Sequence, residues 1–291
     1  MPEAARGLQP AVSAEGCRAL GQAAVRALFD ELSLAPKPGL VSFEDNGSHA
    51  DMNAQTFMRS LRSLRHYFPQ IAALGAQRAP FAALQAAGLA AEQRMLAATG
   101  GINTHRGAVF ALGLLCAAGG ALQAQGRALT PPALRAALQA RWGQALSQRA
   151  RLLPASHGVA AVQRHGLRGA NEEAAAGMPA LFDAVWPALR AALLAGWGWE
   201  RARLQALFAA MATLDDTNLV HRGGLAGLRD VQAAARSFLQ AGGAGRADAV
   251  AHARELHRAL VARHLSPGGS ADLLAAACWL QRVCVAPVPP P

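Results

Sequence analysis

The chain has 291 residues, of which 52% are hydrophobic and only 5% aromatic, and its formal net charge is +10. Ala and Leu dominate while the aromatic residues that strands favour are scarce, so the composition predicts an all-α protein and excludes disorder over most of the chain. The positive charge suits a nucleic acid, an anionic membrane or a small polyanionic substrate.

Apolar residues recur at helical spacing through most of the chain, so the predicted elements are helices. The segment from Lys37 to Asp51 lacks this periodicity, and we expect an ordered loop with Asp51 capping the helix that follows. Thr130 and Ser270 are further helix start signals. The predicted helices span residues 11–32, 52–74, 80–98, 104–122, 131–149, 171–176, 179–195, 199–214, 222–240, 247–264 and 270–284. We expect a single compact multi-helix domain, 1–285, and a flexible proline-rich tail, 286–291.

What the sequence lacks excludes several chemistries. The four cysteines show no CxxC spacing, so neither a zinc site nor a disulfide framework is indicated. A P-loop is excluded because the single lysine, Lys37, lies between prolines, and there is no Rossmann glycine fingerprint, Gly-x-Ser-x-Gly elbow or His-Asp dipeptide. The N-terminus has no apolar signal-peptide core and the uncharged run 107–126 reads as a buried helix, so we expect a cytoplasmic protein.

Residues able to do chemistry gather in short glycine-rich clusters, which favours an enzyme with a site built from loops and helix N-termini. In one cluster, Gly100 and Gly101 come just before a predicted helix start. Free backbone N–H groups at such a start bind anions, and His105 and Arg106 would add donors. An ordinary glycine turn with Thr104 as the N-cap is the alternative.

Another cluster holds Asp215, Asp216, Asn218, His221 and Arg222 between two predicted helices. Carboxylates this close repel one another unless a cation lies among them, and Mg²⁺ with substrate phosphates is a common arrangement. Neighbouring aspartates point in different directions on a helix, so either both of them or only one could be a ligand. A capping and ion-pair role is the alternative.

Two more clusters complete the set. His49 and Asp51 are two residues apart, and acid, base and metal-ligand roles are all open for them, with capping as the alternative. Ser266 and Ser270, with Asp272 in the first turn of the predicted last helix, offer hydroxyl and backbone donors to a phosphate or simply cap that helix.

Together these clusters resemble the triphosphoribosyl-dephospho-CoA synthase family, which supplies the prosthetic-group precursor of malonate decarboxylase and citrate lyase. The matching motifs are Pro-Lys-Pro-Gly-Leu-Val at 36–41, Asn-Gly-Ser-His-x-Asp-Met at 46–52, Gly-Ile-Asn-Thr-His-Arg-Gly at 101–107, Asp-Thr-Asn-Leu-x-His-Arg-Gly-Gly at 216–224 and Ser-Pro-Gly-Gly-Ser-Ala-Asp-Leu-Leu at 266–274. Each motif alone is weak, but all five occur in the family's order.

The chain departs from the family pattern in two places. Ser42 stands where the family usually has an acidic residue after Pro-Gly-Leu-Val. The family's Arg-Gly-Glu-Ala-x-x-Gly-Phe-Pro element is represented by residues 168–179, three residues longer. We therefore assign no role to Arg168 or Glu173.

The resemblance implies attack by the ribose 2′-hydroxyl of 3′-dephospho-CoA on C1′ of ATP, with adenine released and the triphosphate kept. Such a reaction needs a base, an acid and negative charge near C1′. We expect Mg²⁺ on the triphosphate, held by Asp215, Asp216 and Asn218, and Asp51 or His49 as the base. The catalytic candidates are His49, Asp51, Asp216 and His221. The candidates for binding ATP and 3′-dephospho-CoA are Lys37, Gly100, Gly101, Asn103, His105, Arg106, Arg222, Gly223, Gly224, Ser266, Ser270 and Asp272.

The expected partners are these two substrates and a carrier-protein holo-transferase that takes the product, with no nucleic acid and no membrane, and we allow for a homodimer. The Asn-Thr-His-Arg-Gly motif and the arginine-rich context favour malonate decarboxylase over citrate lyase. A metal-dependent nucleotide phosphohydrolase is the rival enzyme, using the same Asp and His clusters but releasing phosphate. A helical nucleic-acid-binding module would explain the charge but has no need of buried aspartates.

Overall fold

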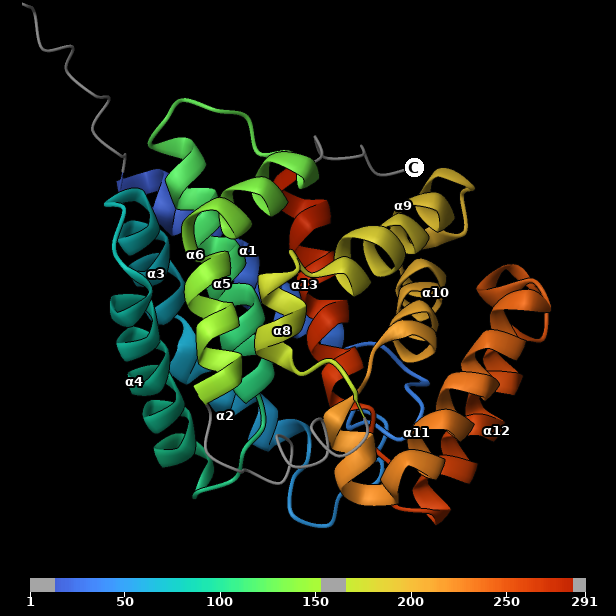
Figure 1. Cartoon of the computed structure of the whole chain (residues 1–291). Helices are drawn as coiled ribbons and strands as arrows, with labels where there is room; N and C mark the ends of the chain where they lie inside the picture. The colour runs from blue at the N-terminus through green and yellow to red at the C-terminus, as the bar shows by residue number, and fades with distance from the viewer. Residues whose placement is uncertain (1–13, 153–165, 285–291) are drawn as a thin grey trace, which may run out of the picture.

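Every regular element in the described residues, 14–152 and 166–284 of the computed structural model, is helical, which confirms the all-α prediction. The predicted tail at 286–291 lies outside these residues. Figure 1 shows how the helices are arranged. They are α1 (Ala14–Leu32), α2 (Ala54–Leu64), α3 (Tyr67–Ala76), α4 (Phe81–Thr99), α5 (Arg106–Gln123), α6 (Pro131–Leu152), α8 (Ala170–Ala175), a π-helical turn (Ala180–Val185), α9 (Trp186–Leu194), α10 (Gly198–Thr213), α11 (Thr217–Gln240), a 3₁₀ turn (Gly243–Gly245), α12 (Ala249–Ala262) and α13 (Gly268–Cys284).

Helix α5 is the centre of the larger part of the fold, in contact with α1, α3, α4, α6 and α13. Among the described helices it is the one that is long and apolar enough to cross a membrane, but 78% of it is buried inside the molecule. Its apolar character is therefore explained by the core, as expected from the sequence.

Glycines let α3 and α5 approach each other backbone to backbone. A Cβ atom at Gly75 would lie 2.0 Å from the carbonyl oxygen of Ala117, and one at Gly120 would lie 2.0 Å from that of Ala72. No side chain fits at either position, so the two helices can pack this closely only with glycine there.

Helix α13 brings the C-terminal half of the chain onto this core, in contact with α1, α5, α10 and α11. The indole N–H of Trp279, which is fully buried, donates to the carbonyl oxygen of Leu20 on α1 at 3.1 Å. Figure 1 shows α11 and α12 on the opposite side of the molecule from α3 and α4. The first turn of α13 therefore lies between the two halves of the chain.

Several helix boundaries differ from the prediction, and local interactions explain why. The predicted helix 52–74 is divided into α2 and α3, and its N-cap is Asn53 rather than Asp51, because Asn53 forms a capping box with Thr56. Helix α13 begins at Gly268, so Ser270 lies inside its first turn. Helix α11 begins five residues before the predicted 222 and contains one non-helical residue, Gly224, with φ 64° and ψ −170°.

We expect Gly75→Ala to lower the free energy of unfolding by about 1–3 kcal/mol, because the added methyl group forces α3 away from Ala117. The matched control is Gly88→Ala on α4, where a Cβ atom meets nothing closer than 3.7 Å. That change should be neutral or stabilise the protein by roughly 0.5–1 kcal/mol. Thermal and urea unfolding followed by circular dichroism measures both, and equal stability of the two variants would contradict the close-packing explanation.

Candidate active site

The predicted clusters meet around the segment Leu265–Asp272, which leads into α13 and is called here the α13 entry segment. From the loop between α1 and α2, the hydroxyl of Ser48 donates to the carbonyl oxygen of Leu265 at 2.6 Å. In the same loop, His49 Nε2 lies 2.9 Å from Ser266 Oγ. More than 200 residues of sequence separate these partners, so the fold alone brings them together.

His49 connects three of the clusters. An Nη2 group of Arg222 lies 3.1 Å from His49 Nδ1, and since arginine can only donate, Nδ1 accepts. The proton of the neutral ring is then on Nε2, which donates to Ser266. Burial, and next the charge of Arg222, lower the pKa of His49. The imidazole is therefore held neutral with both nitrogens in use, and it positions Arg222 and Ser266.

Asp51 is the neighbouring carboxylate, and it is open to solvent. Its side chain is 61% exposed, against 11% for His49, and its Oδ1 lies 3.7 Å from His49 Nδ1. Of the two predicted base candidates, Asp51 is thus the one with free oxygen lone pairs on an accessible surface.

Asp216 is 1% exposed and joins the first turns of α11 and α13. It is the N-cap of α11, where Oδ1 accepts from the Asn218 amide at 3.0 Å. Its Oδ2 accepts from the amide and the hydroxyl of Ser270 at 2.9 and 3.1 Å. Burial raises the pKa of Asp216, and these hydrogen bonds oppose that rise. Its oxygens are already in use within the protein.

Two of the predicted Mg²⁺ ligands, Asp215 and Asp216, already accept hydrogen bonds from the protein. Asp215 Oδ2 accepts from the backbone N–H of Arg168 at 3.0 Å, and Asn218 is exposed beside Gly268. Across 14–152 and 166–284, no group of three or more His, Cys, Asp or Glu side chains could hold a metal ion. We therefore derive no step of the chemistry through Mg²⁺.

Asp272 lies against the N-terminus of α5. It accepts from the Ala108 amide, and a Cβ atom at Gly107 would lie 1.9 Å from its Oδ2, so glycine is required there. Burial, followed by the nearby carboxylates Glu31 and Asp216, raises the pKa of Asp272 well above its ordinary value. No basic side chain of the described residues forms an ion pair with it. This carboxyl group is thus disposed to keep its proton.

Lys37, expected to bind phosphate, is 1% exposed and directed into the protein. Its ammonium group forms an ion pair with the buried carboxylate of Glu31 and donates to the Glu31 carbonyl oxygen at 3.0 Å. Burial lowers the pKa of Lys37 and raises that of Glu31, and the attraction within the pair opposes both shifts. Lys37 therefore ties the loop between α1 and α2 to the end of α1.

The expected phosphate-binding amides at Gly100 and Gly101 are already bonded. Both residues have positive φ, and both N–H groups donate to the carbonyl oxygen of Leu96, which ends α4. Asn103 accepts from the amide of Arg106 at 3.2 Å, and the Arg106 side chain pairs with Glu92 at 3.2 Å. In this arrangement the glycine pair terminates one helix instead of presenting donors to a ligand.

His105 is buried at the N-cap of α5, with 3% exposed surface. Its Nδ1 lies 2.6 Å from Ser60 Oγ, and the Thr104 hydroxyl donates to the same Ser60 oxygen at 2.7 Å. Burial, and then the charge of Lys37, lower the pKa of His105 to about 3. The ring is neutral at physiological pH.

The remaining candidates lie on the exposed side of α11. A Cβ atom at Gly223 would lie 2.4 Å from Leu265 Cδ2, so this glycine allows the α13 entry segment to pack against α11. Gly224 has open space around it, and His221 is exposed. These residues border the site that the other clusters form.

Two side chains near the site were not predicted. Glu31 belongs to the helical pattern of α1, and His257 to that of α12, where its Nδ1 lies 3.1 Å from the Lys37 carbonyl oxygen and its Nε2 lies 3.2 Å from Asp45. Neither lies in a glycine-rich cluster. The only available signal for Glu31 was a carboxylate six residues before the lone lysine.

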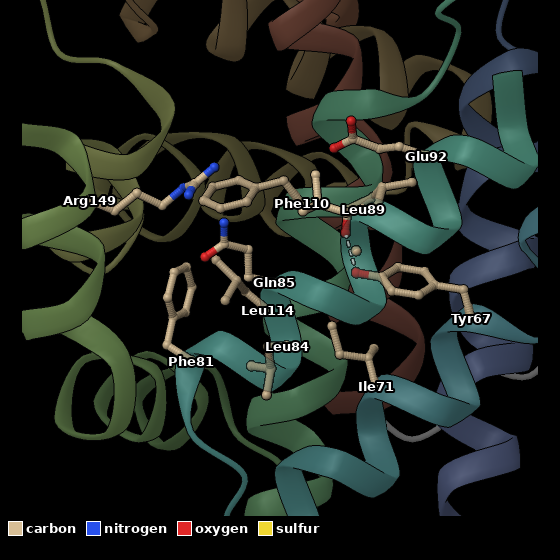
Figure 2. Close-up of a pocket in the computed structure, with 12 residues that line it drawn as sticks. Tyr67, Ile71, Phe81, Leu84, Gln85, Leu89, Glu92, Phe110, Leu114 and Arg149 are labelled. Atoms are coloured by element: carbon tan, nitrogen blue, oxygen red, sulfur yellow. Dashed lines mark hydrogen bonds between the residues drawn. The ribbon is translucent and has the colours of Figure 1, made fainter. Parts of the chain in front are cut away.

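A pocket of about 70 Å³ opens elsewhere, between α3, α4, α5 and α6. Figure 2 shows its mainly apolar lining, with Phe81, Phe110 and Leu114 among the walls and Glu92 and Arg149 as its charged members. None of the predicted site residues lines it.

Comparisons with known proteins agree with the family resemblance. The family model described as ATP:dephospho-CoA triphosphoribosyl transferase matches residues 17–287. A probable 2-(5″-triphosphoribosyl)-3′-dephosphocoenzyme-A synthase of Pseudomonas fluorescens is 43% identical, over 91% of each chain. A protein of Pectobacterium atrosepticum with the same name, without "probable", is 42% identical, over 90% of this chain and 87% of its own.

No solved structure matches the chain. The family model nevertheless covers all five motif stretches and the helices that carry them, and the relatives align over most of their own length. The chain therefore belongs to the ATP:dephospho-CoA triphosphoribosyl transferase family.

Proposed function

We propose that this protein joins the 5-triphosphoribosyl group of ATP to the 2′-hydroxyl of 3′-dephospho-CoA and releases adenine. The observation that carries the proposal is the meeting of the family motifs around the α13 entry segment, through His49–Ser266, His49–Arg222 and Asp216–Ser270. Both substrates are polyanions, and the net charge of +10 favours their capture.

The reaction breaks the C1′–N9 bond of ATP and forms a bond between the 2′-oxygen and C1′. The hydroxyl proton goes to a base, and we assign that role to Asp51, because His49 has no free nitrogen. Adenine takes the electron pair of the broken bond and needs a proton to leave. Asp272 suits this second role, because its surroundings favour its protonated form.

The remaining motif residues act as supports in this proposal. Arg222 is oriented by His49 and by the carbonyl oxygens of Ser48 and His264, at 3.1 and 3.2 Å, and offers its remaining donors to phosphate. Ser266, held by His49, offers a hydroxyl. Mg²⁺ stays a proposal as the usual companion of ATP phosphates, which would supply part of its coordination beside one or two carboxylates.

We propose malonate decarboxylase, rather than citrate lyase, as the enzyme whose carrier subunit receives the product. The support is the Asn-Thr-His-Arg-Gly motif at 103–107 and the arginine-rich composition. A carrier-protein holo-transferase would consume the product. The neighbouring genes test this assignment directly. They should encode subunits of malonate decarboxylase, and subunits of citrate lyase there would contradict it.

When the protein is incubated with ATP, Mg²⁺ and 3′-dephospho-CoA, it should release free adenine. Chromatography and mass spectrometry should show one product molecule, carrying the phosphates of both substrates, for each adenine released. Adenine should not appear when 3′-dephospho-CoA is left out, because the hydroxyl nucleophile is then missing. Release of phosphate or pyrophosphate without adenine would instead favour the phosphohydrolase.

Asp51→Asn should lower kcat by about 10²–10⁴-fold, because the attacking hydroxyl loses its base. The matched control is Glu44→Gln in the same loop, an exposed carboxylate that pairs with Arg254 at 2.8 Å; this change should leave kcat near the wild-type value. An Asp51→Asn enzyme with wild-type kcat would remove this residue from the mechanism.

Asp272→Asn should stabilise the protein while reducing its activity. Because the pKa of Asp272 is raised well above 3.8, the folded state holds this proton more tightly than the unfolded chain does, so stability falls as pH rises above about 4. The variant cannot ionise, so its Tm should exceed that of the wild type near pH 7 and match it near pH 4, while kcat falls by about 100-fold or more.

The control for this variant is Asp230→Asn, a surface carboxylate on α11 that pairs with Arg263 at 2.7 Å. Neither its Tm nor its kcat should change appreciably. A lower Tm of Asp272→Asn at neutral pH would show that the carboxylate stabilises the fold, and unchanged turnover would exclude it as the acid.

A further inference from the structure

The ring of His105 has one nitrogen with no hydrogen-bond partner. Its Nε2 is buried, and within the described part of the chain no donor or acceptor reaches it. The ring of Phe57 lies against it edge-on, with the centroids 4.9 Å apart. A buried polar atom without a partner costs free energy, so its presence calls for an explanation.

The hydrogen bonds on the other side of the ring determine where its proton lies. Thr104 donates to Ser60 Oγ, and the single proton of the Ser60 hydroxyl is then available for His105 Nδ1. With that proton directed at the ring, Nδ1 accepts and the neutral ring carries its proton on Nε2. The unpartnered atom is a donor, and what it lacks is an acceptor.

The surroundings of this donor favour an anionic acceptor. The positively charged ammonium group of Lys37 lies close enough to disfavour a second positive charge on His105. The ring is also at the positive end of the α5 dipole, a helix of 18 residues. A phosphate oxygen is an acceptor of this kind, and both proposed substrates carry several.

The segment that precedes the ring is largely exposed, with Gly100, Gly101 and Asn103 open to solvent. Gly100 and Gly101 have positive φ and no atom within 4 Å of where a side chain would begin, so nothing packs on this turn. Ile102, half-buried, follows them and belongs to the apolar group that includes Phe57. Binding at His105 Nε2 requires 100–103 to move, which would break the hydrogen bond from the Arg106 amide to Asn103 at the start of α5.

We propose that Ser60 and Thr104 are positioning residues that hold His105 as a neutral Nε2–H donor for a phosphate oxygen of a substrate. The proposal rests on the proposed function for the identity of that substrate, which is either ATP, through its triphosphate, or 3′-dephospho-CoA, through its pyrophosphate. In both cases the donor binds without adding charge next to Lys37.

The test is ¹⁵N NMR of the full-length, histidine-labelled protein, with His105 assigned from the His105→Gln variant. His105 should show the Nε2–H tautomer and should not titrate between about pH 5 and 8. ATP or 3′-dephospho-CoA, added separately, should shift its Nε2 signal, and the one that does so identifies the ligand. An Nδ1–H tautomer, or no shift with either compound, would overturn the proposal.

Variants separate positioning from a purely structural role. Thr104→Val should leave His105 with a mixture of tautomers. It should raise KM about tenfold, with little change in kcat, for the substrate that shifts the His105 Nε2 signal. Thr104→Ser should behave as wild type. Ser60→Ala should have the same effect as Thr104→Val. Ser63→Ala is the control, because Ser63 lies on the same helix and donates only to the Ser60 carbonyl oxygen, at 2.6 Å.

Failure of this inference is distinguishable from failure of the proposed function. If the wild type releases adenine but neither compound shifts His105, the positioning role is wrong and the transferase stands. If a substrate shifts His105 but no adenine forms, the donor site stands and the transferase is wrong. Equal KM values for Thr104→Val and Thr104→Ser would also contradict the positioning role.

Discussion

The carboxylate of Asp216 is the interaction on which the candidate site depends. It begins α11 by accepting from Asn218, and through its other oxygen it binds the amide and hydroxyl of Ser270 in α13. Two helix starts that lie 54 residues apart in sequence are thereby fixed side by side. The α13 entry segment can then meet the His49 loop on one face and the start of α5 on the other, through Asp272.

Around this junction the protein buries ionisable groups that reduce stability. Asp272 lies near two other buried carboxylates, Lys37 and Glu31 are both taken out of water, and His105 keeps an unpartnered nitrogen. Removing such groups from water costs several kcal/mol per ion before pairing offsets it. A fold that needed only to be stable would fill these positions with apolar side chains, so their presence in one place supports a chemical role for this region.

The positions of the helices, and several of the residues that come together in the candidate site, could be predicted from the sequence. The contacts that each of these residues makes could not. Helical periodicity is a local signal, and it placed most helices within a few residues of their observed bounds. Hydrogen-bond partners are harder to infer from the sequence: Gly100 and Gly101 were expected to face a phosphate, yet their amides donate to Leu96 and end α4. Asp216 looked like a metal ligand for the same reason, since no pattern in the sequence showed that Ser270 would occupy its oxygens.

The contacts of Lys37 differ from those expected of a substrate-binding lysine. Lys37 was a candidate for binding substrate because it lies in a motif that resembles the family, yet its side chain is buried, with 1% exposed surface. Its compact ammonium group fits between the carboxylate and the carbonyl oxygen of the same residue, Glu31. A guanidinium group is planar and wider and has five donors to satisfy, so arginine could not take this place without leaving donors unpaired. The lysine at this position is therefore explained by its contacts with Glu31 at the end of α1, whereas Arg222 is exposed and keeps its guanidinium group at the surface.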